Sequence, residues 1–393
     1  MSKTQKLDWT TSLFYFSILF PFVSFYPIGS DLQPIFIIMA LIVAIAKKIT
    51  FIKHDSVLII FAIFSLVYLN PFANNFIPYK GLGAYLSIFI SIFTLLIFIK
   101  SFNINLFISI LKKSIIIYFI GSILFYLEPG MFGNFQMNIV RNVNTLESGI
   151  GFRGISTFST EPGLFGGHMI GLLLILFCLF KKMLITKKQM IIYGLMTLSM
   201  VLMSKSGMGY SYLIILAMFL FSKYIKSYKV IIFSAIIAIL IIPKLYLFLE
   251  SNRGLSALLS LADYENIKDS SILNRLYNLF FGFYILIEYP IGMGFNYTSS
   301  YLIELINSNQ FFKNYYGSIS EYGFVSSLAL LISYYGLFFL LFLWYIVQKY
   351  KTPLFYLVFS LLFLTFSFSA AYPIIWILII LSYLLTNSKI VSK

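Results

Sequence analysis

The chain has 393 residues, of which 60% are hydrophobic and only 10% are charged, and it contains 44 phenylalanines and 29 tyrosines. No soluble core could bury that much apolar surface, so the composition excludes a soluble domain and predicts a protein embedded in lipid. The net charge of +15 does not indicate a nucleic-acid partner, because the basic residues stand singly or in pairs between apolar runs. The single cysteine, Cys178, excludes an intramolecular disulfide and a thiolate metal cluster.

Long apolar runs broken by polar, proline or glycine residues predict an all-α, polytopic integral membrane protein with about twelve transmembrane helices. We expect one transmembrane domain over 1–393. The basic N-terminal segment lacks a small-residue cleavage site, so it is expected to lead into an uncleaved first helix. The run 277–290 is short and is assigned to a membrane-facing loop helix. The expected spans are 10–28, 34–48, 55–73, 82–99, 113–128, 163–180, 189–204, 208–223, 229–249, 322–347, 354–371 and 373–387.

The alternation of charge between successive loops predicts how the spans are oriented in the membrane. With both termini in the cytoplasm, the inner side receives 19 of the lysines and no arginine, as the positive-inside rule predicts. The outer side receives eleven of the thirteen carboxylates and all four arginines, namely Arg141, Arg153, Arg253 and Arg275. A guanidinium binds phosphate or carboxylate with a fixed fork of donors, which topology alone would not require. The alternative is that lysine is the default cation of this genome and the arginines pair with nearby outer acids.

Two outer loops are long, at 129–162 and 250–321. Loops of this length in a compact membrane protein are usually functional. The second loop is polar and contains a predicted helix at its centre, so we expect it to form a small lid.

The densest polar motif is the stretch from Gly151 to Gly163, which ends where the sixth span begins. Pro162 suits the first turn of a helix. Glu161 then lies at the positive end of the helix dipole, either as a cap for free N–H groups or as a general base that faces Arg153. His168 follows seven residues later on about the same helix face, either as a site residue or as a histidine bonded to a neighbouring helix.

Two further motifs lie on the outer side. The first is the turn Ser204-Lys205-Ser206-Gly207, where Lys205 either snorkels to lipid headgroups or offers a cation to a lipid-linked phosphate. The second begins at Arg275 and runs through an apolar stretch to Pro290, Gly292 and Gly294, which permit a tight return. It is either an amphipathic helix resting on the bilayer or a lid that brings Arg275 to the cavity of Arg153.

No Walker loop, dinucleotide fingerprint, HExxH or Asp-rich metal motif is present, so no cofactor and no metal site are expected.

These motifs, in this order, resemble the bacterial O-antigen polymerases and the related O-antigen ligases. The resembling features are an Arg-Gly-x-Ser/Thr-x-x-Ser-x-Glu-Pro stretch from Arg153 to Pro162, a Ser-Lys/Arg-Ser-Gly turn at 204–207, a long outer loop, and an Arg-containing helix that ends in Pro-x-Gly-x-Gly. The resemblance covers about 130–340. It implies a metal-independent, membrane-embedded glycosyltransferase of the C type in the bacterial inner membrane.

The resemblance also implies substrates and residue roles. The donor and acceptor would be glycans on undecaprenyl pyrophosphate, with a flippase and a chain-length regulator as further partners besides membrane lipids. Arg153 and Arg275 would hold the pyrophosphate and Glu161 would deprotonate or orient the acceptor hydroxyl. The remaining expected substrate contacts are Lys205, Ser206, Arg253, Arg141 and Glu321.

Two departures from the family pattern matter. The turn carries Lys205 where arginine is common, and the second loop ends in Ser318-Ile319-Ser320-Glu321 without the histidine that ligases usually carry. The second departure favours polymerase over ligase. The base remains open between Glu161, His168 and Glu321.

A transporter, above all a lipid-linked oligosaccharide flippase, is the main alternative class. Alternating access would place charges at the midplane and relate two halves by internal repeats. The spans are nearly free of charge and the loops are unequal, which favours the enzyme.

Overall fold

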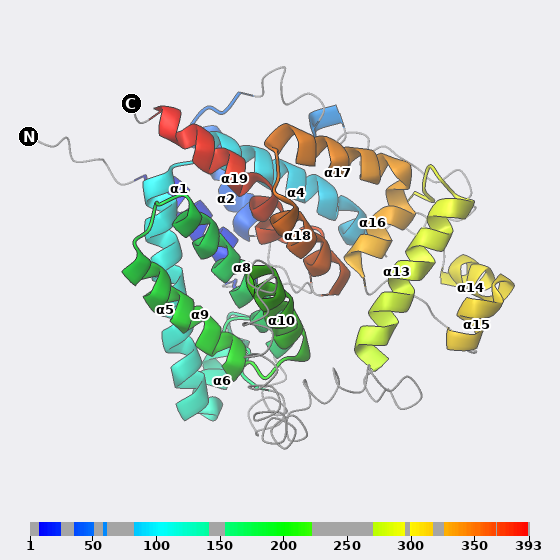
Figure 1. The fold of residues 1–393 in the computed structure, drawn as a ribbon, viewed down its shortest axis with the longest axis horizontal. Coiled ribbons are helices and arrows are strands. Elements are labelled where there is room, and N and C mark those ends of the chain that lie inside the picture. Colours follow the sequence, from blue (N-terminus) through cyan, green and yellow to red (C-terminus); the bar gives the residue numbers. More distant parts are fainter. Residues whose placement is uncertain are drawn as a thin grey trace, which may run out of the picture. The chain divides into compact units, whose positions relative to one another are not determined.

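A computed structural model of the chain describes residues 8–24, 35–50, 58–60, 82–140, 154–221, 270–294, 299–316, 326–366 and 368–391. Throughout these ranges the regular structure is helical, apart from one isolated antiparallel bridge between Val23 and Val140 (Figure 1). The chain divides into two compact units. The first comprises Met1–Ile18, Pro34–Ile104 and Ser271–Lys393, and the second comprises Leu19–Gln33 and Asn105–Ser270.

The first unit is built around its last helix. Residues from Ile374 to Leu381 are at most 2% exposed on every face, as expected for a helix that is apolar all round. Polar side chains of neighbouring segments bond to its backbone. Ser360 of α18 donates to the Ile375 carbonyl at 3.1 Å, and Thr352, between α17 and α18, donates to the Ile379 carbonyl at 2.7 Å. The helices of this unit are α1 (Trp9–Leu19), α2 (Ile35–Ala46), α4 (Leu82–Ser101), α13 (Ser270–Glu288), α14 (Ser299–Ser308), α15 (Gln310–Tyr316), α16 (Ser327–Tyr335), α17 (Leu337–Tyr350), α18 (Leu354–Phe366) and α19 (Pro373–Val391).

Asp8 caps the start of α1. Its carboxylate accepts hydrogen bonds from the backbone N–H of Thr11 at 3.1 Å and from the hydroxyls of Thr10 and Thr11, which is the usual chemistry of a helix N-cap. It also pairs with the Lys47 ammonium at 2.7 Å. Burial raises the pKa of Asp8, but the hydrogen bonds from Lys47, Thr11 and Thr10 outweigh it and hold that pKa well below its ordinary value.

The second unit packs around α8. Its helices are α5 (Ile104–Leu127), α6 (Pro129–Met137), α8 (Pro162–Lys181), α9 (Lys187–Met203) and α10 (Gly207–Phe221). Most of α8 is buried, whereas α5 exposes Ile116, Ile120 and Leu127 along one face. Such an apolar stripe suits contact with lipid rather than water.

The apolar helices indicate a protein embedded in a membrane. Among the described residues, α5 and α8 are long and apolar enough to cross a bilayer, and α16 with α17 would form a third span if the pair, bent by 113°, is one span. Several shorter apolar helices accompany them. Helices lie at all the expected spans except 55–73 and 229–249, which fall largely outside the described residues. The full count of about twelve stays a prediction.

The break between α16 and α17 is joined to the Pro-x-Gly-x-Gly return that follows α13. Gly336, at the break, and Gly292, in the return, both have positive φ, at 54° and 90°. A side chain on either glycine would overlap the backbone of the other segment. Three backbone hydrogen bonds connect the segments: Leu337 N–H to the Pro290 carbonyl at 2.8 Å, Met293 N–H to the Ser333 carbonyl at 2.8 Å, and Gly294 N–H to the Tyr334 carbonyl at 3.1 Å.

The helix expected within 277–290 is confirmed and is longer, because α13 spans Ser270–Glu288. One of its faces packs on α14 and α15, where Phe281 and Ile285 join Leu302, Ile306 and Phe312 in an apolar cluster. Its Gly282 lies against Ala329 of α16, so closely that an added Cβ would be 2.9 Å from the Ala329 Cα. The centre of the second long loop is therefore a packed helical layer (Figure 1).

Candidate active site

The segment that leads into α8 buries its polar side chains. Ser156, Thr157 and Ser159 are at most 1% exposed, and Thr160 is 8% exposed. The backbone turns sharply here, with the Ser159 N–H donating to the Ser156 carbonyl at 2.9 Å and Thr157 at a positive φ of 45°. This polar turn belongs to the motif that the sequence singles out, and its hydroxyl-bearing residues are buried.

The same segment packs on the turn between α9 and α10. The Ile155 N–H donates to the Met203 carbonyl at 3.2 Å. Gly154 has a φ of 83°, and a Cβ at this position would overlap the carbonyl of Ser204 and approach the Cβ of Lys205 to 2.9 Å. Only glycine fits this combination of backbone angle and close approach. Two motifs separated by more than 40 residues in the chain are thus in direct contact and form one site.

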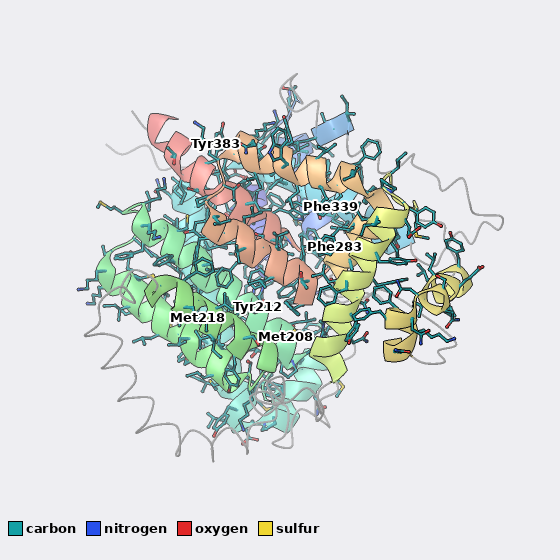
Figure 2. The ribbon with its side chains drawn as sticks, turned by 45° about the vertical axis from the view of Figure 1, so that its right-hand side comes forward. Met208, Tyr212, Met218, Phe283, Phe339 and Tyr383 are labelled. Atoms are coloured by element: carbon teal, nitrogen blue, oxygen red, sulfur yellow. The ribbon has the colours of Figure 1, made fainter. Side chains whose placement is uncertain are left out.

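Close packing of α8 on α10 continues below the turn. An added Cβ on Gly166 would lie 3.2 Å from the Gly209 Cα and 2.9 Å from the Ser204 hydroxyl oxygen, a small-residue contact typical of membrane helices. Ser206 is buried and accepts a hydrogen bond from the Gly209 N–H at 3.2 Å. Met208 and Tyr212, at the start of α10, can be followed in Figure 2.

Lys205 lies at the tip of this turn with an exposed side chain and a positive φ of 45°. A positive φ is unfavourable for a side chain such as lysine, so the surrounding packing holds it there. The exposure fits either of the two interpretations of this lysine, a headgroup contact or a phosphate contact.

Glu161 occupies the N-cap position of α8, and Pro162 is in the first turn as predicted. The Glu161 side chain makes no cap hydrogen bond and is exposed. The alternative that this carboxylate satisfies the first N–H groups of the helix is therefore wrong. A carboxylate at this end of the helix is still favoured by the helix dipole, and it is left available to a ligand.

His168 lies in a different environment from Glu161. It is fully buried, with its ring 5.8 Å from that of Phe22 and 5.1 Å from that of Tyr118, and it hydrogen-bonds the backbone of Leu19. This arrangement matches the alternative of a histidine bonded to a neighbouring segment. The seven-residue spacing predicted a shared face, but it did not reveal that His168 lies deep in the unit while Glu161 is at the surface.

The polar turn is completed by α5 and α6. The hydroxyls of Ser122, on α5, and Thr157 lie 2.9 Å apart, and the Phe158 ring packs between Phe20, Tyr118 and Phe132. On α6, the buried amide nitrogen of Gln136 donates to the Ser156 hydroxyl at 3.1 Å and to the Ser159 carbonyl at 3.0 Å. Sequence reasoning missed Gln136. The sequence shows Gln136 only as a single amide among aromatic residues, and this does not indicate that it bonds to Ser156 and Ser159.

One of the remaining predicted site residues lies within the described ranges, and its proximity to Glu161 stays a prediction. Arg275 is half-buried on α13, in the first unit. Arg141, Arg153, Arg253 and Glu321 lie outside the described residues, so their proximity to Glu161 stays a prediction. Within the described ranges, no three side chains of His, Cys, Asp or Glu are grouped as a metal ion would need. Comparison with models of protein families, with curated proteins and with solved structures finds no match to this chain.

Proposed function

We propose that this protein is a metal-independent glycosyltransferase of the membrane that polymerises undecaprenyl-pyrophosphate-linked repeat units into O-antigen or a similar surface polysaccharide. The observation that carries the proposal is the contact of Gly154 with Ser204. It joins the Arg-Gly-x-Ser motif to the Ser-Lys-Ser-Gly turn, and both motifs belong to the family resemblance.

Each charged group has a role in the proposed reaction. The acceptor hydroxyl gives its proton to Glu161 while its oxygen forms a bond to the anomeric carbon of the donor glycan. The bond between that carbon and the pyrophosphate oxygen breaks, and undecaprenyl pyrophosphate leaves with the electron pair. Arg153 and Arg275 are proposed to hold the pyrophosphate, because preorganised cations stabilise charge as it develops on a leaving group. Lys205 adds a further positive charge.

The surroundings of Glu161 support its assignment as the base. Its carboxylate is exposed and takes no part in capping α8, so an acceptor could reach it. The first turn of α8 also lies at the Ser204–Gly207 turn, since an added Cβ on Gly163 would be 3.7 Å from the Ser206 hydroxyl oxygen. The proposed base and the turn that carries Lys205 are therefore on neighbouring segments, which supports a proposal of acid–base catalysis beside an anionic leaving group.

The proposal includes a topology. About twelve spans, both termini in the cytoplasm and the motifs on the outer face of the bacterial inner membrane would place the reaction where flipped repeat units arrive. The lysine pairs at the end of α8 and the start of α9, Lys181–Lys182 and Lys187–Lys188, lie at the ends of these helices opposite to Glu161 and Lys205. This separation is the charge asymmetry that the positive-inside rule describes.

Deletion of the gene tests the proposal. The surface glycan would be separated on a gel, and the deletion strain is expected to show the lipid anchor with a single repeat unit in place of a ladder. Loss of a flippase would instead leave no unit on the surface, and loss of a ligase would leave polymer on undecaprenyl pyrophosphate. An unchanged ladder, or either of these two other patterns, would contradict the proposed polymerase.

A further inference from the structure

Three polar atoms at the polar turn are buried without an internal hydrogen bond. They are the hydroxyl oxygens of Ser159 and Thr160 and the amide oxygen of Gln136, and none has a hydrogen-bond partner among the residues that the structure describes. Ser159 and Gln136 are fully buried and Thr160 is 8% exposed. Buried polar groups are almost always paired, and each exception requires an explanation.

The three residues that carry these atoms are neighbours. The Gln136 amide nitrogen donates to the Ser159 carbonyl at 3.0 Å, and Thr160 is the next residue along the chain. Because a carbonyl can only accept, it fixes the orientation of the Gln136 amide, so the Gln136 oxygen is the atom left over. The following residue, Glu161, is exposed. The group therefore lies directly beneath the surface at the start of α8, beside the proposed base.

The chemistry of these atoms selects a class of ligand. The Gln136 oxygen can only accept a hydrogen bond, so it requires a ligand that donates, and a phosphate or carboxylate anion has no proton to give. The two hydroxyls can donate or accept. A neutral group with several hydroxyls satisfies all three atoms, and a sugar ring is such a group.

We propose that Gln136, Ser159 and Thr160 form a subsite that binds the hydroxyl groups of a sugar ring in the lipid-linked repeat unit, next to Glu161. This inference rests on the proposed polymerase function. The subsite orients the neutral sugar, while the pyrophosphate is left to the cationic residues. Gln136 thereby becomes a residue that determines which sugar is accepted.

A purely structural turn would behave differently on substitution. Ser159→Ala and Thr160→Val remove hydroxyls that make no internal hydrogen bond, so folding should not suffer and removal of an unpaired group can even stabilise the protein. Ser122→Ala is the matched control, because the Ser122 hydroxyl donates to the Tyr118 carbonyl at 2.8 Å and lies 2.9 Å from the Thr157 hydroxyl. This control is expected to lower the melting temperature.

The experiment uses the full chain in lipid nanodiscs, with the lipid-linked repeat unit extracted from the deletion strain as substrate. Ser159→Ala and Thr160→Val are each expected to raise KM for the repeat unit about tenfold, the size of one hydrogen bond to a ligand, with an unchanged or higher melting temperature. An unchanged KM, or a raised KM with a lower melting temperature as in a structural defect, would overturn the subsite. If the wild-type chain forms no polymer from the repeat unit, the proposed function fails and the subsite fails with it.

Discussion

Gly154 lies against the carbonyl of Ser204, with a φ of 83° and no room for a side chain between the two. Through this contact the segment that precedes α8 is fixed on the turn that joins α9 to α10. The two residues of the Arg-Gly pair in the motif are therefore required for different reasons. The glycine is required by packing, whereas Arg153 is proposed to act on the substrate.

Gly154→Ala is predicted to destabilise the protein by about 2 kcal/mol or more, because the new side chain meets both a positive φ and backbone atoms. Polymer formation should fall with it. Thermal unfolding of the purified chain and a glycan gel measure the two effects. The control is Gly130→Ala, where nothing lies within 4 Å of an added Cβ; equal melting temperatures for the two variants would argue against the described packing.

Glu161→Gln is predicted to lower the rate of polymer formation without lowering the stability of the fold. Since the carboxylate makes no cap hydrogen bond, the free energy of unfolding should change by less than about 0.5 kcal/mol. The rate of polymer formation should fall by about 100-fold or more, the usual contribution of a general base. A variant that keeps the wild-type rate would remove Glu161 from the mechanism and leave Glu321 as the next candidate base.

Gly292→Ala is predicted to weaken the junction between the end of α13 and the break at Gly336. The φ of Gly292 is 90°, and an added Cβ would overlap the Tyr334 carbonyl. We expect a loss of about 2 kcal/mol, seen as faster proteolysis near 290 and 336. Gly194→Ala serves as control, because its Cβ would make only ordinary contacts at 3.8 Å and 3.9 Å. If Gly292→Ala is cleaved no faster than the control, the close contact described between Gly292 and the α16–α17 break does not stabilise this junction.

The Asp8 carboxylate is predicted to make the folding stability of the chain fall as the solution becomes acidic. Its pKa in the folded chain is lowered from 3.8 by hydrogen bonds from Lys47, Thr11 and Thr10 that outweigh the opposing effect of burial. The stabilisation is thus complete above about pH 4 and is lost progressively as the pH falls from there toward the lower folded-state pKa. Asp8→Asn, which can still cap α1, should cost about 0.5 kcal/mol at pH 7 because the pair is partly exposed.

The measurement is the difference in melting temperature between the wild type and Asp8→Asn at pH 7 and at pH 3. The difference should shrink at pH 3. Lys47→Met, which removes the partner, should show the same trend. A difference that stays equal at both pH values would mean that the ion pair does not contribute.

The helical class and the start of α8 were predictable because they depend on local signals. Apolar runs mark helices, and Pro162 after Glu161 marks a first turn. The sequence does not predict the break at Gly336, and the expected span 322–347 runs through it. The hydropathy of α16 and α17 is continuous across the break. The 113° turn is accompanied by contacts with the Pro290–Gly294 return, which lies far away in the sequence.

The candidate site was predictable in part. The resemblance brought the motif at 153–162 and the turn at 204–207 into one family pattern, but no property of the sequence stated that Gly154 touches Ser204. The depth of His168 and the partnership of Gln136 with Ser159 depend on how α5, α6 and α8 pack. Side-chain spacing along one helix carries no information about that packing.

The most direct test of the proposed function is polymerisation by the purified chain. The wild type, Arg153→Ala and Arg275→Ala would be placed in lipid nanodiscs with the undecaprenyl-pyrophosphate-linked repeat unit and EDTA, and the products would be separated by length. The proposal predicts a ladder from the wild type in EDTA and none from either arginine variant, with all three proteins equally folded. A wild type that makes no ladder, or makes one only when divalent metal is restored, would contradict the account.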